Sequence, residues 1–162
     1  MSAIDPSLYE EIIVESADGS KTVNIAAGVV MIDYYEDIIS PTITVKIQVI
    51  NDGGTIEGDD GQLQTIYNGL PLRGGERVKL KIAGNTDTNP GLDFSSDVEK
   101  YLFVSSITNV ISRTENESFT LNLVSREAIT NETTRVGRKF STSSKISESV
   151  KKIIKDKKYL NT

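Results

Sequence analysis

The feature that most constrains the fold of this 162-residue chain is a strict alternation of apolar and polar side chains in residues 42–49, which read TITVKIQV. Because successive side chains of a strand point to opposite faces of a sheet, this pattern predicts a strand with one buried and one exposed face. Residues 77–82 and 118–124 repeat the alternation. Residues 28–35 and 101–111 are apolar enough to predict strands with both faces partly covered. We therefore expect a mainly β protein of six to eight antiparallel strands.

Turn signals separate these strands. Asp18 and Gly19 form a hairpin signal between two short apolar runs. Pro41 separates the strands on either side of it, because proline cannot donate to a strand ladder. Residues 114–117 are expected to turn the chain between the last two strands. The Gly74–Gly75 pair precedes a strand rather than a helix, so it is interpreted as a turn and not as a phosphate-binding loop.

The end of the chain changes period, from two to that of a helix. Its apolar residues fall at helical spacing and form one stripe: Ile146, Val150, Ile153 and Ile154. Ser143 or Ser144 is predicted to cap this helix. The fold expected is an antiparallel β-barrel with a C-terminal amphipathic α-helix. The barrel spans residues 1–142, with 1–27 as an N-terminal hairpin or extension. Residues 143–162 form the helical part, which is expected to dock on its own sheet or on a partner chain.

The composition excludes large classes of chemistry. The chain has no cysteine and no histidine, which removes thiolate catalysis, Ser-His-Asp triads and sites built on those metal ligands. No carboxylate pair has a spacing that predicts a glycosidase. We expect a protein that is not an enzyme and that has no cofactor and no metal.

Charge is unevenly distributed along the chain. Residues 1–100 carry 7 basic and 17 acidic side chains, whereas residues 101–162 carry 11 basic and 6 acidic ones. The overall charge of −5 argues against general nucleic-acid binding, which requires a basic excess. No segment approaches the length of a membrane span, so no membrane association is expected.

The order of motifs is more specific than any single one. Residues 34–41 (YYEDIISP) lead into the strand 42–50, which is followed by Asn51 and Asp52. Residues 69–78 (GLPLRGGERV), a hairpin and the terminal helix follow in turn. Across residues 29–155 this order resembles the N-terminal barrel of the baseplate hub protein of contractile-tailed phages, a tail-tube-like fold. The same fold occurs in the hub part of type VI secretion spike proteins.

The resemblance implies a structural role. Hubs of this family form a ring, a trimer, between the tail tube protein and the central spike protein, and they contact other baseplate proteins. DNA would pass through the ring without specific binding. The expected location is the virion tail baseplate, assembled in the host cytoplasm. In the family a second barrel follows the first, which would place it in a segment beyond residue 162.

Two long polar loops are the expected contacts between subunits or between rings. The first is acidic, but it lacks the residue spacing of an EF-hand, so a solvated loop is favoured over a cation site. The second is rich in asparagine and glycine. The candidate residues are Asp52, Glu57, Asp59 and Asp60 in the first loop, and Asn85, Asp87 and Asn89 in the second.

Two alternatives to a phage hub stay open. One is the equivalent component of a type VI-like secretion or other contractile injection system. The other is a ligand-binding β module, although the absence of tryptophan and an aromatic content of 6% leave few residues for a binding platform.

Overall fold

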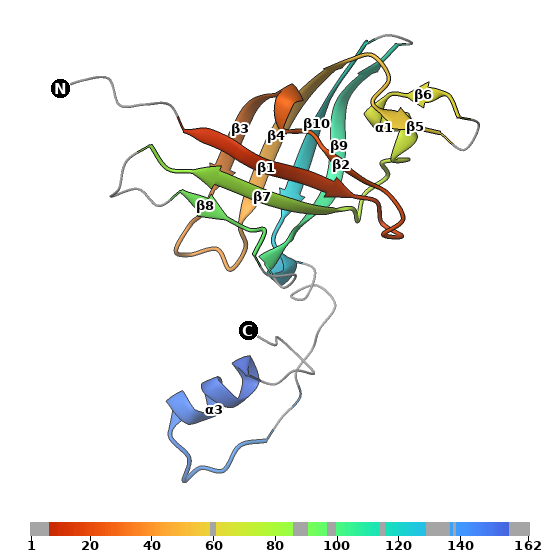
Figure 1. Ribbon diagram of the computed structural model, residues 1–162. Helices are drawn as coiled ribbons and strands as arrows, with labels where there is room; N and C mark the ends of the chain where they lie inside the picture. Colours follow the sequence, from red (N-terminus) through yellow and green to blue (C-terminus); the bar gives the residue numbers. More distant parts are fainter. Residues whose placement is uncertain are drawn as a thin grey trace, which may run out of the picture.

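The protein is mainly β: an antiparallel sheet curls into a half-barrel, and a helix follows it near the C-terminus (Figure 1). The structure is a computed structural model that describes residues 7–58, 61–85, 91–96, 100–113, 116–128, 137 and 139–155. The strands are β1 (Leu8–Glu15), β2 (Thr22–Asn24), β3 (Val29–Tyr35), β4 (Thr44–Asp52), β5 (Ile56–Glu57), β6 (Leu63–Gln64), β7 (Arg77–Ala83), β8 (Leu92–Asp93), β9 (Leu102–Ser112) and β10 (Asn116–Val124). The helical segments are η1 (Ala26–Gly28), α1 (Ile66–Gly69) and α3 (Ile146–Ile154).

Long-range pairing, rather than chain order, builds the sheet. Its strand order is β2-β1-β7-β9-β10-β4-β3, with β8 added to β7, and every pairing is antiparallel. In Figure 1, β1 and β7 cross in front of β3, β4, β10 and β9, which gives the half-barrel two walls. The short strands β5 and β6 form a separate hairpin beyond the end of β4.

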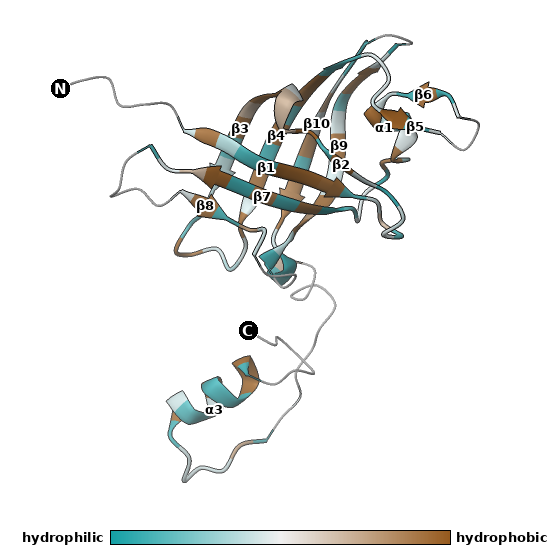
Figure 2. Ribbon diagram, in the orientation of Figure 1, coloured by the Kyte–Doolittle hydropathy of each residue, from teal (hydrophilic) through white to brown (hydrophobic). Residues whose placement is uncertain are grey.

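The core lies between these two walls, and the predicted alternation places it there. Figure 2 shows brown and teal residues alternating along β7 and a continuous brown stretch in the second half of β1. From β4 and β10, the buried side chains include Val45, Ile47, Phe119 and Leu121, each no more than 1% exposed. The opposite wall, from β1 and β7, contributes Ile12, Val14, Val78 and Leu80. Each such side chain stabilises the fold by about 1.5–3 kcal/mol, counted against an extended chain.

The predicted turns are confirmed where glycine adopts a left-handed backbone. Gly19 in the β1–β2 turn has φ of 74°, and Gly74 and Gly75 before β7 have φ of 107° and 91°. Glycine adopts these values without strain because it has no Cβ to clash with the backbone. The glycine pair is therefore a turn, as the sequence predicts.

The N-terminal segment contains the predicted hairpin of β1 and β2, and β1 also pairs with β7, which incorporates the hairpin into the sheet. One prediction about strands is corrected by the structure. The segment 101–111 was expected to be covered on both faces, but in β9 the residues from Ser105 onward are mostly exposed. The physical reason is that β9 extends past β7, so its second half has no opposing wall.

Two predictions about element ends also change. Asn116 and Glu117 do not belong to the turn between the last strands but begin β10. The C-terminal helix forms with its predicted apolar stripe. Its first residue is Ile146, whereas a helix capped by Ser144 would begin at Lys145. Its N-cap is Lys145, which makes no side-chain capping bond, so neither Ser143 nor Ser144 caps the helix.

Candidate functional site

The first predicted contact loop lies beyond the end of β4. Asp52 ends that strand opposite Asn116 of β10, and Glu57 lies in β5; both side chains are exposed. Asp59 and Asp60 lie outside the described residues. The described part of this predicted loop, residues 51–58 and 61–62, contains β5, which pairs with β6 just after the loop, and α1 follows β6.

A buried glutamate fixes this excursion to the sheet. Glu117 of β10 is 2% exposed. One carboxylate oxygen accepts hydrogen bonds from the backbone N–H of Ile66 at 2.6 Å and the side-chain amide of Asn51 at 3.0 Å. The other oxygen accepts the N–H of Tyr67 at 3.1 Å. Glu117 therefore caps the first turn of α1 from a distant strand.

The second predicted loop starts at the opposite end of the sheet. Asn85 follows β7, whose last residue, Ala83, pairs with Leu8 at the start of β1. Asp87 and Asn89 lie outside the described residues. The two loops are thus separated: one lies at the β9–β10 end, and the other starts where β1 begins.

A second buried glutamate organises the glycine turn before β7. Glu76 is 1% exposed, and its carboxylate accepts the backbone N–H of Arg73 at 2.6 Å and that of Gly74 at 2.9 Å. The backbone of Gly75 continues the turn by donating to the carbonyl oxygen of Val104 at 2.8 Å. Glu76 is therefore a loop-shaping residue, and no local pattern in the sequence distinguishes it from an exposed strand glutamate.

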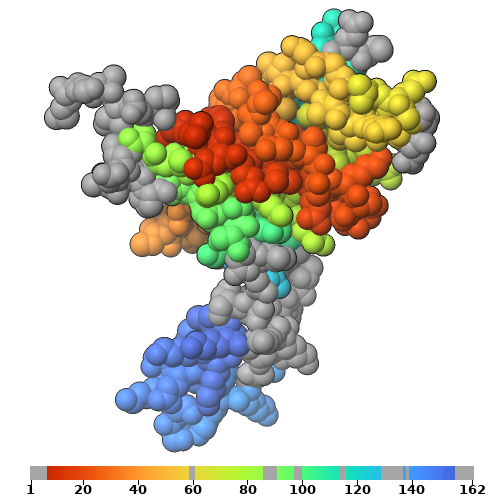
Figure 3. Space-filling view, in the orientation of Figure 1, coloured from red at the N-terminus to blue at the C-terminus, as the bar shows by residue number. Residues whose placement is uncertain are grey.

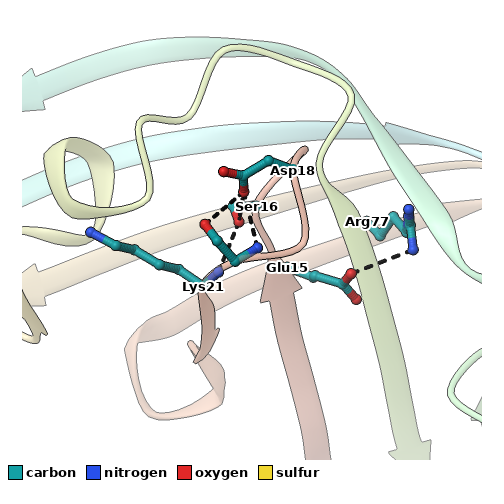
Figure 4. Close-up of polar contacts among 6 residues, drawn as sticks. Glu15, Ser16, Asp18, Lys21 and Arg77 are labelled. Atoms are coloured by element: carbon teal, nitrogen blue, oxygen red, sulfur yellow. Dashed lines mark hydrogen bonds and ion pairs between the residues drawn. The ribbon is translucent and has the colours of Figure 1, made fainter.

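Short hydrogen bonds also stiffen the β1–β2 turn (Figure 4). Asp18 accepts the hydroxyl of Ser16 at 2.6 Å, the hydroxyl of Ser20 at 2.7 Å and the N–H of Ser20 at 3.0 Å. These hydrogen bonds lower the pKa of the Asp18 carboxyl to about 2. Beside the turn, Arg77 of β7 pairs with Glu15 of β1 at 3.4 Å.

An open groove of about 630 Å³ runs between this turn and the loop shaped by Glu76. Its lining includes Asp18, Lys21 and Arg73 as charged groups and Leu70 and Pro71 as apolar ones. The volume falls in the range of small-molecule sites. Glu76, which also lines the groove, is buried and accepts the N–H groups of its turn. Asp18 and Arg73 are exposed, and Lys21 is half-buried.

The most distinctive surfaces are two strand edges. β3 ends the sheet, and among the strands that the structure describes it is hydrogen-bonded only to β4. β9 forms the other side of the four-stranded unit β3-β4-β10-β9. After Val104, β10 is the only strand that pairs with β9 among the described residues. An open edge exposes backbone donors and acceptors that can pair with another strand.

Both edges expose apolar side chains near the same end of the four-stranded unit. On β3 these are Val30 and Met31; on β9 they are Val110 and Ile111. Val29 of β3 pairs with Val49 of β4. Ile111 of β9 pairs with Ser118 of β10, and Ser118 in turn pairs with Ile50 of β4. The start of β3 and the end of β9 therefore lie at the same end of the unit.

The predicted docking helix does not pack on the sheet. None of the α3 residues is buried: Ile146 is 83% exposed, Val150 is exposed and Ile153 is half-buried. Figure 3 shows the α3 surface, in blue, uncovered by the strands. Docking on its own sheet is not what the structure shows, and docking on a partner stays a prediction.

Within the described ranges, no group of three or more acidic side chains is placed to hold a metal ion. No helix in the described part of the chain is long and apolar enough to cross a membrane. Comparisons with protein-family models, with curated proteins and with solved structures find no match to this chain. What the protein does is therefore inferred from its sequence pattern and its own surfaces.

Proposed function

We propose that this protein is a ring-forming structural subunit, a hub component of a contractile phage tail baseplate that joins the tail tube to the central spike. The observation that carries the ring is the pair of open edges on the four-stranded unit β3-β4-β10-β9. The sequence motifs that resemble phage hubs supply the setting.

Strand direction supports a head-to-tail contact. The three pairings within the unit are antiparallel, so β3 and β9 run in opposite directions. A neighbour's β3 placed beside β9 would continue the antiparallel alternation without a break. Such a heterologous contact repeats around an axis and closes into a ring where the rotation allows it.

Apolar matching supports the same contact. Val30 and Met31 of one copy would lie opposite Val110 and Ile111 of the next if the ladder between copies is shifted by about three residues from the level at which Met31 and Thr108 lie within one unit; all four apolar side chains are exposed in the single chain. Their burial would add to the hydrogen bonds of the shared ladder. The ring would therefore cover the two edges that are most open in one subunit.

The polar face of the unit suits a passage for DNA that does not bind it. The face of the unit that points away from the buried side chains of β4 and β10 carries the neutral residues Gln48, Asn122 and Thr108. It also carries one cation and one anion at paired positions, Lys46 on β4 and Asp33 on β3. Specific or tight DNA binding requires a cluster of cations. A mostly neutral face of this kind offers phosphate no such cluster.

The test uses two edge variants of the full chain in sedimentation and electron microscopy. Met31→Asp charges the β3 edge and Ile111→Asp charges the β9 edge; Leu8→Asp, an exposed apolar residue on β1, is the matched control. We expect the unmodified protein and the control to assemble, and each edge variant to stay monomeric. A mixture of the two edge variants retains one intact edge of each kind, so it should give dimers and no rings.

Equal assembly of the edge variants and the unmodified chain would exclude the edge contact. Dimers of Ile111→Asp alone would instead indicate a symmetric contact between two β3 edges.

The same surfaces would serve a hub of a type VI-like secretion system. Neighbouring genes separate the two settings: capsid and tube genes indicate a phage, and an ATPase with sheath and immunity genes indicates a secretion system. The groove beside Asp18 is the one observation that favours a ligand-binding β module. A thermal-shift screen in which no small molecule or glycan stabilises the protein would remove that candidate.

A further inference from the structure

The loop between β3 and β4 exposes two adjacent isoleucines at its tip. Ile38 is fully exposed and Ile39 is 87% exposed, and the loop projects from the surface (light orange in Figure 3). Tyr35, at the start of the loop, is half exposed. Neighbouring large apolar side chains on a projecting loop indicate an interaction site rather than scattered surface residues.

Hydrogen bonds hold this tip in one shape. The Asp37 carboxylate accepts the backbone N–H of Ile39 at 2.8 Å, and the Asp37 carbonyl oxygen accepts the N–H of Ser40 at 3.1 Å. The Tyr34 hydroxyl donates to the Glu36 carboxylate at 2.8 Å. A loop that is already ordered loses less conformational entropy when it binds.

The amphipathic helix α3 offers a surface of complementary character. Its apolar stripe includes Ile146 and Val150, which are exposed. Lys151 and Lys152 flank that stripe on opposite sides of the helix. Residues 145–155 hold four lysines and one glutamate, a net charge of +3, whereas the loop tip carries Glu36 and Asp37.

We propose that α3 of one copy packs its apolar stripe on the Ile38–Ile39 tip of a second copy. The contact would bury the two most exposed isoleucines of the sheet domain against Ile146 and Val150. The lysines beside the stripe would then lie close to the acidic residues beside the tip. Apolar burial would supply the affinity, and the opposite charges would orient the helix.

The chain leaves the sheet beside the same loop. Ser125, just after β10, is hydrogen-bonded to the base of this loop. The N–H of Ile43 donates to the Ser125 hydroxyl oxygen at 3.1 Å, and the N–H of Ser125 donates to the carbonyl oxygen of Ile43 at 2.9 Å.

 Twenty residues, 126–145, connect Ser125 to α3, and a chain of that length spans at most about 66 Å. No residue of α3 is buried in the single chain, and the connection is long enough for α3 to reach a second copy.

This contact is separate from the ring edges, since it uses neither the open side of β3 nor that of β9. It is tested by disulfide formation, for which the chain is suited because it has no native cysteine. Ile39→Cys is placed in one full-length chain and Val150→Cys in a second chain of different mass, and the two are mixed in a glutathione redox buffer. A disulfide requires Cα atoms about 4.4–6.8 Å apart, so only close packing gives a high yield.

We expect the mixed disulfide to form at least fivefold more than between Val150→Cys and Leu63→Cys. Leu63 on β6 is the matched control because it is also a large apolar residue, 69% exposed against 87% for Ile39, but lies at the other end of the sheet. Equal yields would overturn the proposal. A chain carrying both Ile39→Cys and Val150→Cys tests the alternative: a disulfide that forms only within that chain would show that α3 docks on its own loop.

Charge reversal checks the orientation of the helix. Glu36→Lys in the Ile39→Cys chain should lower the yield, and Lys151→Glu with Lys152→Glu in the partner chain should restore it. Repeating the mixture with Met31→Asp in both chains separates this contact from the ring. A disulfide that persists there supports helix docking even where the edge contact is lost, and a disulfide that disappears would show that docking is only a consequence of the ring.

Discussion

The carboxylate of Glu117 on β10 accepts a 2.6 Å hydrogen bond from the backbone N–H of Ile66, which lies 51 positions earlier in the chain. The same buried side chain also binds Asn51 at the end of β4. One residue of the sheet thus fixes both the start of α1 and the point where the chain leaves β4. The position of the β5–β6 hairpin therefore depends on Glu117 rather than on the hairpin's own short strands.

Replacing Glu117 by alanine should therefore destabilise the protein by about 2–3 kcal/mol, because buried N–H groups lose their acceptor. Glu117→Gln keeps one acceptor oxygen and should cost less. Urea unfolding followed by circular dichroism measures both. Glu57→Gln, an exposed glutamate on β5, is the matched control and should change the free energy of unfolding by less than about 0.5 kcal/mol. Equal effects at the two positions would contradict the capping role.

Gly75→Ala should destabilise the protein by about 1–2 kcal/mol through backbone strain alone. The φ of Gly75 is 91°, yet a Cβ built there meets no atom within 4 Å, so steric crowding adds nothing. Gly137→Ala is the control, since that glycine also has open space around it but its φ lies outside the left-handed region. Thermal unfolding of both variants checks the prediction, and a Gly75→Ala protein as stable as the control would contradict it.

Asp18 should make stability depend on pH in the acid range. Its pKa is about 2 in the folded protein against an ordinary value of 3.8, so the folded state favours the charged form. The stabilisation is complete above about pH 4 and is lost as the pH falls through about 2. Carboxyl NMR should place the Asp18 midpoint near 2, and Asp18→Asn should flatten the fall in stability over this interval. A midpoint near 4 would contradict the hydrogen-bond geometry of the turn.

Assembly should protect particular backbone amides from hydrogen exchange. If β3 of one copy pairs with β9 of the next, amides in both strands gain hydrogen-bond partners that one subunit does not provide. Exchange measured at low and high protein concentration should slow in residues 29–35 and 105–112. The β1–β7 pairing, which is complete within one chain, supplies the internal control. Unchanged exchange in both edge strands of an assembled sample would contradict the contact.

Much of the fold was predictable from local pattern. The alternation around Val45 and Leu121, the turn at Gly19 and the helical spacing from Ile146 each depend on neighbouring residues, so the sequence alone indicates them. The place of β1 was not predictable in the same way. It depends on pairing with β7, more than sixty residues away, and no local pattern encodes that partner.

The surfaces were harder to predict than the core. Glu76 stands at the start of a predicted strand and Glu117 in a predicted turn, where both look exposed in sequence, and their burial depends on loop N–H groups supplied by the folded backbone. The exposed isoleucines 38 and 39 were visible in the sequence as part of a family-like motif, but only the loop geometry shows that they point to solvent. Open edges such as that of β3 follow from strand order, which local patterns leave undetermined.

The central claim is that copies of this chain join edge to edge, β9 of one beside β3 of the next. Cryo-electron microscopy of the assembled full-length protein tests it most directly. The account predicts a closed ring in which one antiparallel sheet crosses each subunit boundary, with Met31 of one copy near Ile111 of its neighbour. Subunits that remain single at high concentration, or that pair through two β3 edges related by a twofold axis, would contradict it.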